Sequence, residues 1–338
     1  MVVQQRTQPR PLQASAGGTA VQVNPSSAPR ILNALTVDVE DYFQVSAFEQ
    51  RVARSEWGSF ESRVCRNTER LLGLFEEARV RATFFVLGWV AERFPELVRR
   101  ILSAGHELAS HSYEHRLVYS ISPKQFREDL RRAKYALESA GGVPIVGYRA
   151  PSYSITRDAL WALDILVEEG YVFDSSIYPI HHDRYGIPDW PRHVHRLECA
   201  TGALWELPGS TVRWASANFP MGGGGYFRLL PYGWTKRGIQ RLNEREQQPA
   251  VFYLHPWEID PDQPRIETGG FSGLRHYRNL HKTESRLRQL LRDFRFGTVS
   301  EVLAEAQARS GPAASHKCHR PRTYVAASAD LCLQKGRL

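Results

Sequence analysis

Short apolar runs and longer segments of helical spacing alternate along this chain from residue 31 to about residue 308. The apolar runs have the length and composition of buried strands. Strands are predicted at 31–37, 82–87, 106–110, 143–148, 171–173, 203–207, 250–254 and 296–299. Helices are predicted at 68–78, 95–105, 123–139, 157–169, 283–293 and 300–308.

Proline, glycine and asparagine positions set several helix boundaries. Pro95 and Pro123 stand where helices are expected to begin, and Gly105 follows the end of one of them. Asn67 is placed to cap the helix that carries Leu71 at its apolar face. The regular alternation of strand and helix predicts an α/β fold, with a parallel sheet that is open or closed into a barrel.

The pattern also divides the chain into parts. Residues 31–310 are expected to form a single catalytic domain, since no linker or internal repeat interrupts them. Residues 177–235 are rich in aromatic residues, Pro and Gly, and are interpreted as long loops over one mouth of the barrel. Residues 1–30 are interpreted as a disordered lead-in and residues 311–338 as a disordered basic tail.

Charge and cysteine usage exclude some classes of protein. The net charge is +8, of which the first 30 residues supply +3 and residues 311–338 supply +4. The remaining +1 belongs to the body of the chain, which argues against a nucleic-acid partner. The four cysteines form no CxxC pair, which indicates free thiols rather than a zinc module.

Apolar runs long enough for membrane insertion are missing from the sequence. No run of about 18 apolar residues is present, so no transmembrane segment is predicted. The N-terminus lacks the apolar core of a secretory signal peptide, and a cytoplasmic location is therefore expected.

An acidic cluster follows the first predicted strand. Asp38, Glu40 and Asp41 come at the carboxyl end of a buried apolar run. Placing three carboxylates there costs desolvation and mutual repulsion, and this end of a barrel strand is where such folds carry their chemistry.

Two histidines follow the strand at 106–110. His111 and His115 are four residues apart, and would share one face if the segment were helical. Two imidazoles and one carboxylate form a common open metal site. The acidic cluster and the histidine pair together therefore predict a metal centre at the barrel mouth.

Two further strand ends carry candidate groups. Arg149 follows the strand at 143–148 and could orient a carboxylate, while Pro151 would fix the loop behind it. His255 ends the strand at 250–254 and could act as a general acid, with Trp257 forming an apolar wall. The glycine run 222–225 lacks a phosphate-loop pattern and is interpreted as backbone that approaches the sugar or the metal closely.

The order of these motifs resembles a known family. The acidic strand end, His111-Ser-Tyr-Glu-His115, Arg149-Ala-Pro-Ser-Tyr153, Asp174-Ser-Ser and Leu254-His-Pro follow one another as in the NodB-homology polysaccharide deacetylases, carbohydrate esterase family 4. The resemblance spans roughly residues 31–300. It is strongest to the exosortase-associated branch found beside exopolysaccharide loci, through Asp38-Val-Glu-Asp-Tyr-Phe43, Met221-Gly-Gly-Gly-Gly-Tyr-Phe-Arg228 and His255-Pro-Trp-Glu258.

The resemblance implies a distorted (β/α) barrel of seven or eight strands and a divalent metal, zinc by preference. It implies that one carboxylate, His111 and His115 hold the metal, that Asp38 is the general base, that Arg149 orients this base, and that His255 is the general acid. The residues expected to contact the substrate are Tyr42, Pro151, Tyr153, Asp174, Tyr226 and Trp257.

Two positions depart from the family pattern. Most members have adjacent aspartates, whereas Val39 separates Asp38 from Glu40 and Asp41 here. Glu40 shares a strand face with Asp38 if the strand continues, and Asp41 is reached if the strand ends; we favour Asp41 as the metal ligand, with Glu40 as the alternative.

The second departure concerns the partner of the catalytic histidine. Ile177 stands where the family has the aspartate that pairs with this histidine. The groups that could replace it are Asp174, Glu206 and Glu258, and the sequence leaves the choice open.

The expected function is hydrolytic removal of N-acetyl groups from an amino-sugar polysaccharide, of the exopolysaccharide, peptidoglycan or chitin type. A backbone N–H near Tyr42 or Phe43 is expected to stabilise the oxyanion. Two alternatives stay open: a metal-independent hydrolase of another carbon–nitrogen bond on the same fold, and a non-catalytic polysaccharide-binding module.

Overall fold

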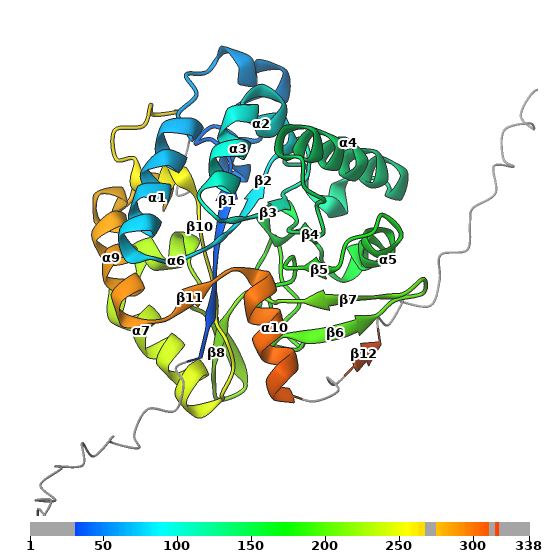
Figure 1. The fold of residues 1–338 in the computed structure, drawn as a ribbon, viewed down its shortest axis with the longest axis vertical. Coiled ribbons are helices and arrows are strands. Elements are labelled where there is room, and N and C mark those ends of the chain that lie inside the picture. Colours follow the sequence, from blue (N-terminus) through cyan, green and yellow to red (C-terminus); the bar gives the residue numbers. More distant parts are fainter. Residues whose placement is uncertain (1–30, 268–274, 311–314, 318–338) are drawn as a thin grey trace, which may run out of the picture. The chain divides into compact units, whose positions relative to one another are not determined.

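The computed structural model describes residues 31–267, 275–310 and 315–317 (Figure 1). The predicted disorder of residues 1–30 and of most of the tail falls outside these ranges. Of the four cysteines, Cys65 and Cys199 lie within them, and Cys65 is a free thiol.

A single large sheet organises the described residues. It has ten strands, in the order β10-β1-β2-β3-β4-β5-β7-β6-β12, with β11 also paired to β1. Every pair from β10 to β7 is parallel, and only β6 and β7 run antiparallel. The strands are β1 (Asn33–Val39), β2 (Thr83–Val86), β3 (Glu107–Ser110), β4 (Gly147–Tyr148), β5 (Phe173–Asp174), β6 (His195–Glu198), β7 (Ala203–Glu206), β10 (Val251–Leu254), β11 (Phe296–Gly297) and β12 (Ser315–Lys317).

Irregular backbone closes the gap between β7 and β10. The N–H of Gly209 donates to the carbonyl of Ile177 on one side of the gap (2.9 Å). On the other side, the N–H of Val251 donates to Ser210 Oγ (2.6 Å), and the N–H of Tyr253 donates to the carbonyl of Gly222 (2.8 Å). The predicted distorted barrel is therefore confirmed: eight strands from β10 to β6 curl around, and a non-strand segment completes the circuit.

Helices cover the outer face of the sheet, as the alternation predicts (Figure 1). They are α1 (Val64–Ala78), α2 (Gly88–Arg93), α3 (Pro95–Ser103), α4 (Pro123–Gly141), α5 (Trp161–Glu168), α6 (Gly224–Leu229), α7 (Tyr232–Gln240), α9 (Leu280–Asp293) and α10 (Val299–Ser310). A π-helical turn, Arg241–Arg245, continues α7, and short 3₁₀ turns lie at Ser46–Phe48, Arg54–Ser59, Val118–Ser120, Pro151–Tyr153, Arg157–Ala159 and Pro256–Ile259.

Two local predictions are wrong. Helix α1 begins at Val64, so Asn67 lies inside the helix and donates a hydrogen bond to Asp260 (3.1 Å) instead of capping it. The segment 177–235 is not only loop, because it contains β6, β7, α6, the start of α7 and the hairpin of β8 (Thr211–Trp214) with β9 (Ala217–Pro220). Of these strands, β7 was predicted, at 203–207. Strands β6 and β8 were missed because they are short and mix charged with apolar residues.

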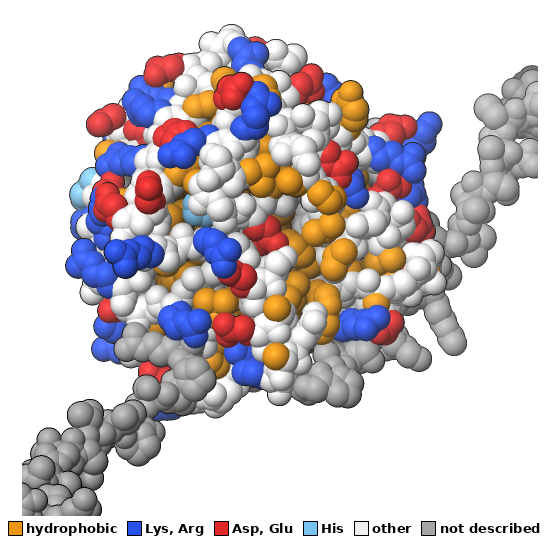
Figure 2. All heavy atoms as spheres, viewed as in Figure 1, with side chains coloured by type: hydrophobic (Ala, Val, Ile, Leu, Met, Phe, Trp, Pro, Cys, Tyr) orange, Lys and Arg blue, Asp and Glu red, His pale blue; other side chains and the backbone are white. Residues whose placement is uncertain are grey.

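The charges of the body are mixed. Lys and Arg side chains are interspersed with Asp and Glu over the face drawn in Figure 2. This agrees with the near-neutral balance of the chain between residues 31 and 310. Among the described helices, none combines the length and the apolar character that crossing a membrane requires.

Close packing at the sheet predicts unequal effects for two glycine substitutions. A Cβ on Gly147 in β4 would lie 2.0 Å from Cζ of Phe173 on the neighbouring strand β5, whereas a Cβ on Gly73 in α1 meets nothing within 4 Å. We expect Gly147→Ala to lower the free energy of unfolding by about 1–3 kcal/mol. Gly73→Ala should raise it by roughly 0.5–1 kcal/mol. Urea denaturation of both variants measures the difference, and equal effects would contradict the packing seen at β4.

Candidate active site

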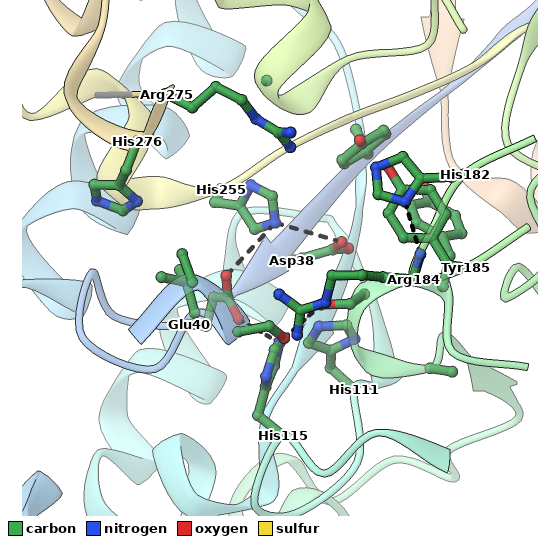
Figure 3. A pocket seen from close by; sticks show the side chains of 18 of the residues that line it. Asp38, Glu40, His111, His115, His182, Arg184, Tyr185, His255, Arg275 and His276 are labelled. Carbon is green, nitrogen blue, oxygen red and sulfur yellow. Dashed lines mark hydrogen bonds and ion pairs between the residues drawn. The ribbon is translucent and has the colours of Figure 1, made fainter. Parts of the chain in front are cut away.

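One cavity at the carboxyl ends of the parallel strands collects most of the predicted site residues. Asp38 and Glu40 reach it from the end of β1, His111 and His115 from the segment after β3, and His255 from the end of β10 (Figure 3). These segments are far apart in sequence, and the parallel register of β10, β1, β2 and β3 brings their ends to one edge of the sheet.

Glu40, His111 and His115 form the group that could hold a metal ion. One ligand atom from each of them lies within 4.8 Å of the other two, and all three residues are buried. Glu40 Oε2 lies 2.8 Å from His115 Nε2 and accepts no other hydrogen bond. Ligand atoms of a tetrahedral zinc site are separated by about 3.4 Å, as follows from bonds of about 2.1 Å. Two imidazoles and a carboxylate at this spacing fit a zinc-type ion.

The protonation states suit metal binding. Burial lowers the pKa of His111 to about 4, which keeps its imidazole neutral. Burial by itself would raise the pKa of Glu40, but His115, His255 and His111 together hold it at about 2. The group therefore offers an ionised carboxylate and a neutral imidazole, the forms that ligate a metal.

The backbone that carries the two histidines is a strained turn. The sequence analysis expected His111 and His115 to share one face if the segment after β3 were helical. The segment is not helical. Ser112 and His115 adopt φ of 70° and 53°, a conformation that costs of order 1–3 kcal/mol for such residues. Asp129 of α4 holds the turn by accepting hydrogen bonds from Ser112 Oγ (2.5 Å) and from the N–H of Tyr113 (2.8 Å).

Asp41 lies elsewhere. Its Oδ2 accepts hydrogen bonds from Ser62 Oγ (2.7 Å) and from the N–H groups of Arg63 (2.8 Å) and Val64 (3.2 Å), at the start of α1. Asp41 thus caps a helix N-terminus, where its charge also meets the positive end of the helix dipole. The geometry contradicts the preference for Asp41 as ligand and favours the alternative, Glu40. Glu40 and Asp38 line the same cavity, and the N–H of Glu40 donates to the carbonyl of Asp38 (3.1 Å) in a tight turn at the end of β1.

A buried ion pair fixes Asp38. The guanidinium of Arg149 donates from Nη1 to Asp38 Oδ1 (2.7 Å) and to Thr36 Oγ1 (2.8 Å), and from Nη2 to Ser175 Oγ (2.9 Å). Arg149 is fully buried and lies 4.2 Å above the ring of Phe85. Its carbonyl lies 2.8 Å from His111 Nδ1, which leaves Nε2 of that ring for the metal. Arg149 therefore orients both the candidate base and one candidate ligand.

His255 has its own carboxylate partner, Glu258. Its Nδ1 lies 2.6 Å from Glu258 Oε1, and its Nε2 faces Asp38 Oδ2 (3.9 Å) and Glu40 Oε1 (3.5 Å). Burial by itself lowers the pKa of His255, but the hydrogen bond to Glu258 and the charges of Glu40, Glu258 and Asp38 raise it to about 9. Of the three carboxylates considered for this place, the structure pairs Glu258 with His255.

Arg228 holds Glu258 in turn. Its Nε donates to Glu258 Oε2 (2.7 Å), and its Nη1 donates to the carbonyl of His276 (2.6 Å). Arg228 comes from the glycine-rich segment, which we interpreted from the sequence as backbone close to the sugar or the metal. The sequence analysis did not predict that this segment supplies a counter-charge to Glu258. The available signal was an arginine three residues after the glycine run.

Two aromatic rings support the histidine. The rings of His255 and Trp257 stack at 5.1 Å, and those of Trp257 and His276 stack at 4.2 Å. Trp257 Nε1 also donates to Glu40 Oε1 (3.3 Å). Trp257 thus forms the expected apolar wall of the cavity. It also contacts both His255 and Glu40 of the candidate metal group.

The expected substrate contacts are only partly brought together. Tyr153 and Trp257 line the cavity, whereas Tyr42, Pro151, Asp174 and Tyr226 do not. Tyr42 packs in a neighbouring aromatic cluster, and its N–H donates to Asp41 Oδ1 (3.0 Å), so that N–H is not available to an oxyanion. Cavity-lining residues that the sequence did not indicate are Tyr119, His182, Arg184, Tyr185, Tyr253, Arg275 and His276.

Asp174 and Glu206 form a buried carboxyl pair behind the site. They are register partners on β5 and β7, and both are fully buried. Burial raises the pKa of Asp174 to about 6, and burial together with the charge of Asp174 raises the pKa of Glu206 further above its usual range. The pair therefore holds a proton at neutral pH, and Asp174 is a structural residue and not a substrate contact.

Known proteins share these motifs. Residues 56–167 match the family model described as polysaccharide deacetylase, which includes the histidine turn and the Arg149 segment. This part of the chain is therefore similar to the polysaccharide deacetylases. Residues 175–304 match a second model, described as a domain of unknown function, DUF3473, and this range contains Glu206, Arg228, His255 and Glu258.

Named relatives match about a third of the chain. A peptidoglycan-N-acetylglucosamine deacetylase of Bacillus cereus is 31% identical over 98 residues, 29% of this chain and 36% of the relative. A chitooligosaccharide deacetylase of Bradyrhizobium is 31% identical over 99 residues, 29% of this chain and 43% of the relative. The chain thus matches well under half the length of these two relatives.

A solved structure supports the fold over nearly the whole chain. A Mycobacterium smegmatis protein assigned to the polysaccharide deacetylases superposes with a TM-score of 0.58 and 24% sequence identity, covering 89% of this chain and 98% of that chain. This likeness confirms the deacetylase fold.

The carboxyl pair predicts a pH-dependent stability difference. Because the folded-state pKa values of Asp174 and Glu206 are raised, the stability that protonation gives is complete below the unfolded values near 4 and is lost as pH rises through 6 and above. Glu206→Gln should therefore gain stability relative to wild type between pH 5 and 8, by up to about 1.4 kcal/mol per pH unit. Urea denaturation at each pH tests this. Glu128→Gln, on the exposed side of α4, is the control, and a difference that stays flat with pH for both variants would show that the pair holds no proton.

Proposed function

We propose that this protein is a metal-dependent hydrolase that removes N-acetyl groups from an amino-sugar polysaccharide and releases acetate. One observation carries the proposal: a candidate metal group, an arginine-oriented carboxylate and a carboxylate-paired histidine line the same cavity. Glu40, Asp38 and His255 represent these three functions, and they come from the ends of two adjacent strands, β1 and β10. The named relatives act on peptidoglycan and on chitooligosaccharides, which makes an N-acetylated amino sugar the substrate class we favour.

Glu40, His111 and His115 would hold the metal, and two imidazoles with one carboxylate are a ligand set that suits zinc. Bound there, the ion would polarise the acetamide carbonyl and lower the pKa of a water molecule in the cavity. Three protein ligands leave coordination positions for water and substrate, as in other catalytic zinc sites. The remaining chemistry belongs to residues of the chain.

Asp38 is assigned as the general base. Arg149 holds Oδ1, while Oδ2 faces the cavity 3.9 Å from His255 Nε2, so one oxygen is free to take a proton from the attacking water. Because the Arg149 side chain is buried and bonded to three separate residues, the carboxylate cannot rotate away without losing those bonds. This is the pre-organisation that general-base catalysis requires.

His255 is assigned as the general acid that protonates the leaving sugar amine. Glu258 holds Nδ1–H, which directs Nε2–H into the cavity, and the raised pKa keeps the ring protonated at neutral pH. Glu258 thereby takes the place of the family aspartate that Ile177 replaces. Both His255 and its partner lie in the part that matches DUF3473, so we propose that this part supplies the acid half of the site.

The two alternatives are separated by simple observations. A metal-independent amide hydrolase would contain no stoichiometric metal and would keep its activity with a chelator. A non-catalytic polysaccharide-binding module would bind oligosaccharide without releasing acetate. The main test is acetate release from chitooligosaccharides and from peptidoglycan glycan strands, with metal content measured on the same sample.

Substitutions at the candidate metal group should separate ligands from neighbours. We expect Glu40→Gln, His111→Ala and His115→Ala each to lose metal while the far-ultraviolet circular dichroism stays unchanged. Asp41→Asn should keep the metal and lower the free energy of unfolding by about 1–2 kcal/mol, because it weakens the cap of α1. Elemental analysis reports the metal. Loss of metal in Asp41→Asn together with full occupancy in Glu40→Gln would restore Asp41 as the ligand.

Substitutions at the proton-transfer groups should reduce the rate and leave the metal in place. Asp38→Asn, His255→Ala and Glu258→Gln are each expected to lower kcat by about 10²–10⁴-fold, as removal of a general base, an acid or the acid's orienting carboxylate does. The matched control is Glu61→Gln, an exposed acid paired with Arg63. If Asp38→Asn strips the metal instead, Asp38 is a ligand and the base must be sought elsewhere.

A further inference from the structure

The charges that line the cavity are mostly paired within the protein. Asp38 pairs with Arg149, Glu40 with His115, and Arg228 with Glu258, and each of these side chains is buried. These pairs are accounted for by the catalytic roles above. Because these buried charges are paired with one another, they leave little net charge at the bottom of the cavity for binding a charged substrate.

Two cavity-lining arginines have no such partner. Among the described residues, Arg184 and Arg275 form no ion pair with any carboxylate, and no side chain hydrogen-bonds to either guanidinium. The acid nearest in sequence is Asp183, whose carboxylate lies 2.8 Å from His182 Nδ1 and is 83% exposed. Most other arginines of the described chain are paired with carboxylates, whereas Arg184 and Arg275 are exposed side chains that line one cavity without such a partner.

Both arginines are directed into the cavity. In Figure 3 the Arg184 side chain extends from the His182–Tyr185 loop toward the candidate metal group, and Arg275 points in from the side of His255 and His276. Their proximity is reflected in the pKa of His182. Burial lowers this pKa, Asp183 opposes the shift, and Arg275 and Arg184 then both lower it further. The two cations therefore face one space from opposite segments.

A stacked aromatic wall flanks Arg184 in the chain and lines the same cavity. The rings of His182 and Tyr185 stack at 3.9 Å and 14°, and those of Tyr185 and Tyr178 stack at 6.1 Å and 15°. Next to them, the hydroxyl of Tyr153 is buried, lines the same cavity and has no hydrogen-bond partner. A flat ring face and an unsatisfied hydroxyl are features that a sugar ring would complete, so the wall marks a place for a saccharide unit beside the reacting one.

We propose that the substrate is an acidic amino-sugar polymer, in which a sugar that carries a carboxylate adjoins the N-acetylated sugar. Arg184 and Arg275 bind this carboxylate while the His182–Tyr185 wall carries the ring. Planar guanidinium groups match carboxylate geometry with two parallel hydrogen bonds, which makes arginine well suited to this recognition. A neutral chitin chain would leave both cations unpaired. The inference rests on the proposed deacetylase function and specifies its substrate class.

The test compares acetate release from three oligosaccharides: chitotetraose, carboxymethylated chitotetraose of the same linkage, and hyaluronan tetrasaccharide. We expect kcat/KM to be higher for the two acidic probes than for chitotetraose. Arg184→Gln and Arg275→Gln should each lower the ratio of acidic to neutral kcat/KM by about tenfold, since a charge-assisted hydrogen bond is lost. Raising NaCl from 50 to 300 mM should lower the same ratio in wild type.

The matched control is Arg278→Gln, which removes an exposed arginine three residues from Arg275 that does not line the cavity. Its ratio should equal that of wild type. The inference is overturned if wild type prefers chitotetraose, or if neither cavity arginine changes the ratio. If no probe releases acetate, the proposed function fails. Calorimetric binding of the same probes to wild type then decides the inference alone, and equal affinity for acidic and neutral probes counts against it.

Discussion

The buried ion pair between Arg149 and Asp38 is the interaction on which the site depends. Removing a guanidinium from water costs several kcal/mol, so the charge is tolerated only with a carboxylate and full hydrogen bonding around it. Asp38 and Thr36 of β1 and Ser175 after β5 supply these contacts, and the Arg149 carbonyl reaches His111 after β3. One side chain therefore ties together the ends of the strands that carry the base and the candidate metal group.

A second buried arginine plays the corresponding role on the other side of the cavity. Arg228 neutralises Glu258, which in turn holds His255, and the Nη1 group of Arg228 donates to backbone carbonyls around His276. On our proposal, Glu258, three residues after the histidine, takes the role of the usual aspartate that Ile177 replaces. Its buried carboxylate requires a counter-charge, which Arg228 of the glycine-rich segment provides.

The region of unknown function is thus continuous with the rest of the barrel. It supplies β6, β7, β10 and β11 to the same sheet, and β10 is the direct neighbour of β1. The aromatic and basic residues around His182 and Tyr185 also come from it. On our proposal, the first part of the chain brings the metal ligands and the base, and the second brings the acid and the groups that select the substrate.

Much of this was determined by the sequence alone. The alternation of apolar runs with helical segments specified the barrel, because strand and helix periods differ and each buries one face. The residues Asp38, His111, His115, Arg149 and His255 were identifiable because each lies at the end of a buried strand or soon after it, and parallel strands bring such ends together.

Only the tertiary structure decided the rest. The choice between Asp41 and Glu40 as the candidate metal ligand depended on the position of the start of α1. The N–H of Val64, 23 residues from Asp41, lies there and donates to the Asp41 carboxylate. Glu258, Glu206 and Asp174 were equivalent as carboxylates, and their roles diverged because β7 sets Glu206 against Asp174 while a 3₁₀ turn returns Glu258 to His255. Such choices rest on contacts between segments distant in the chain, which no local pattern encodes.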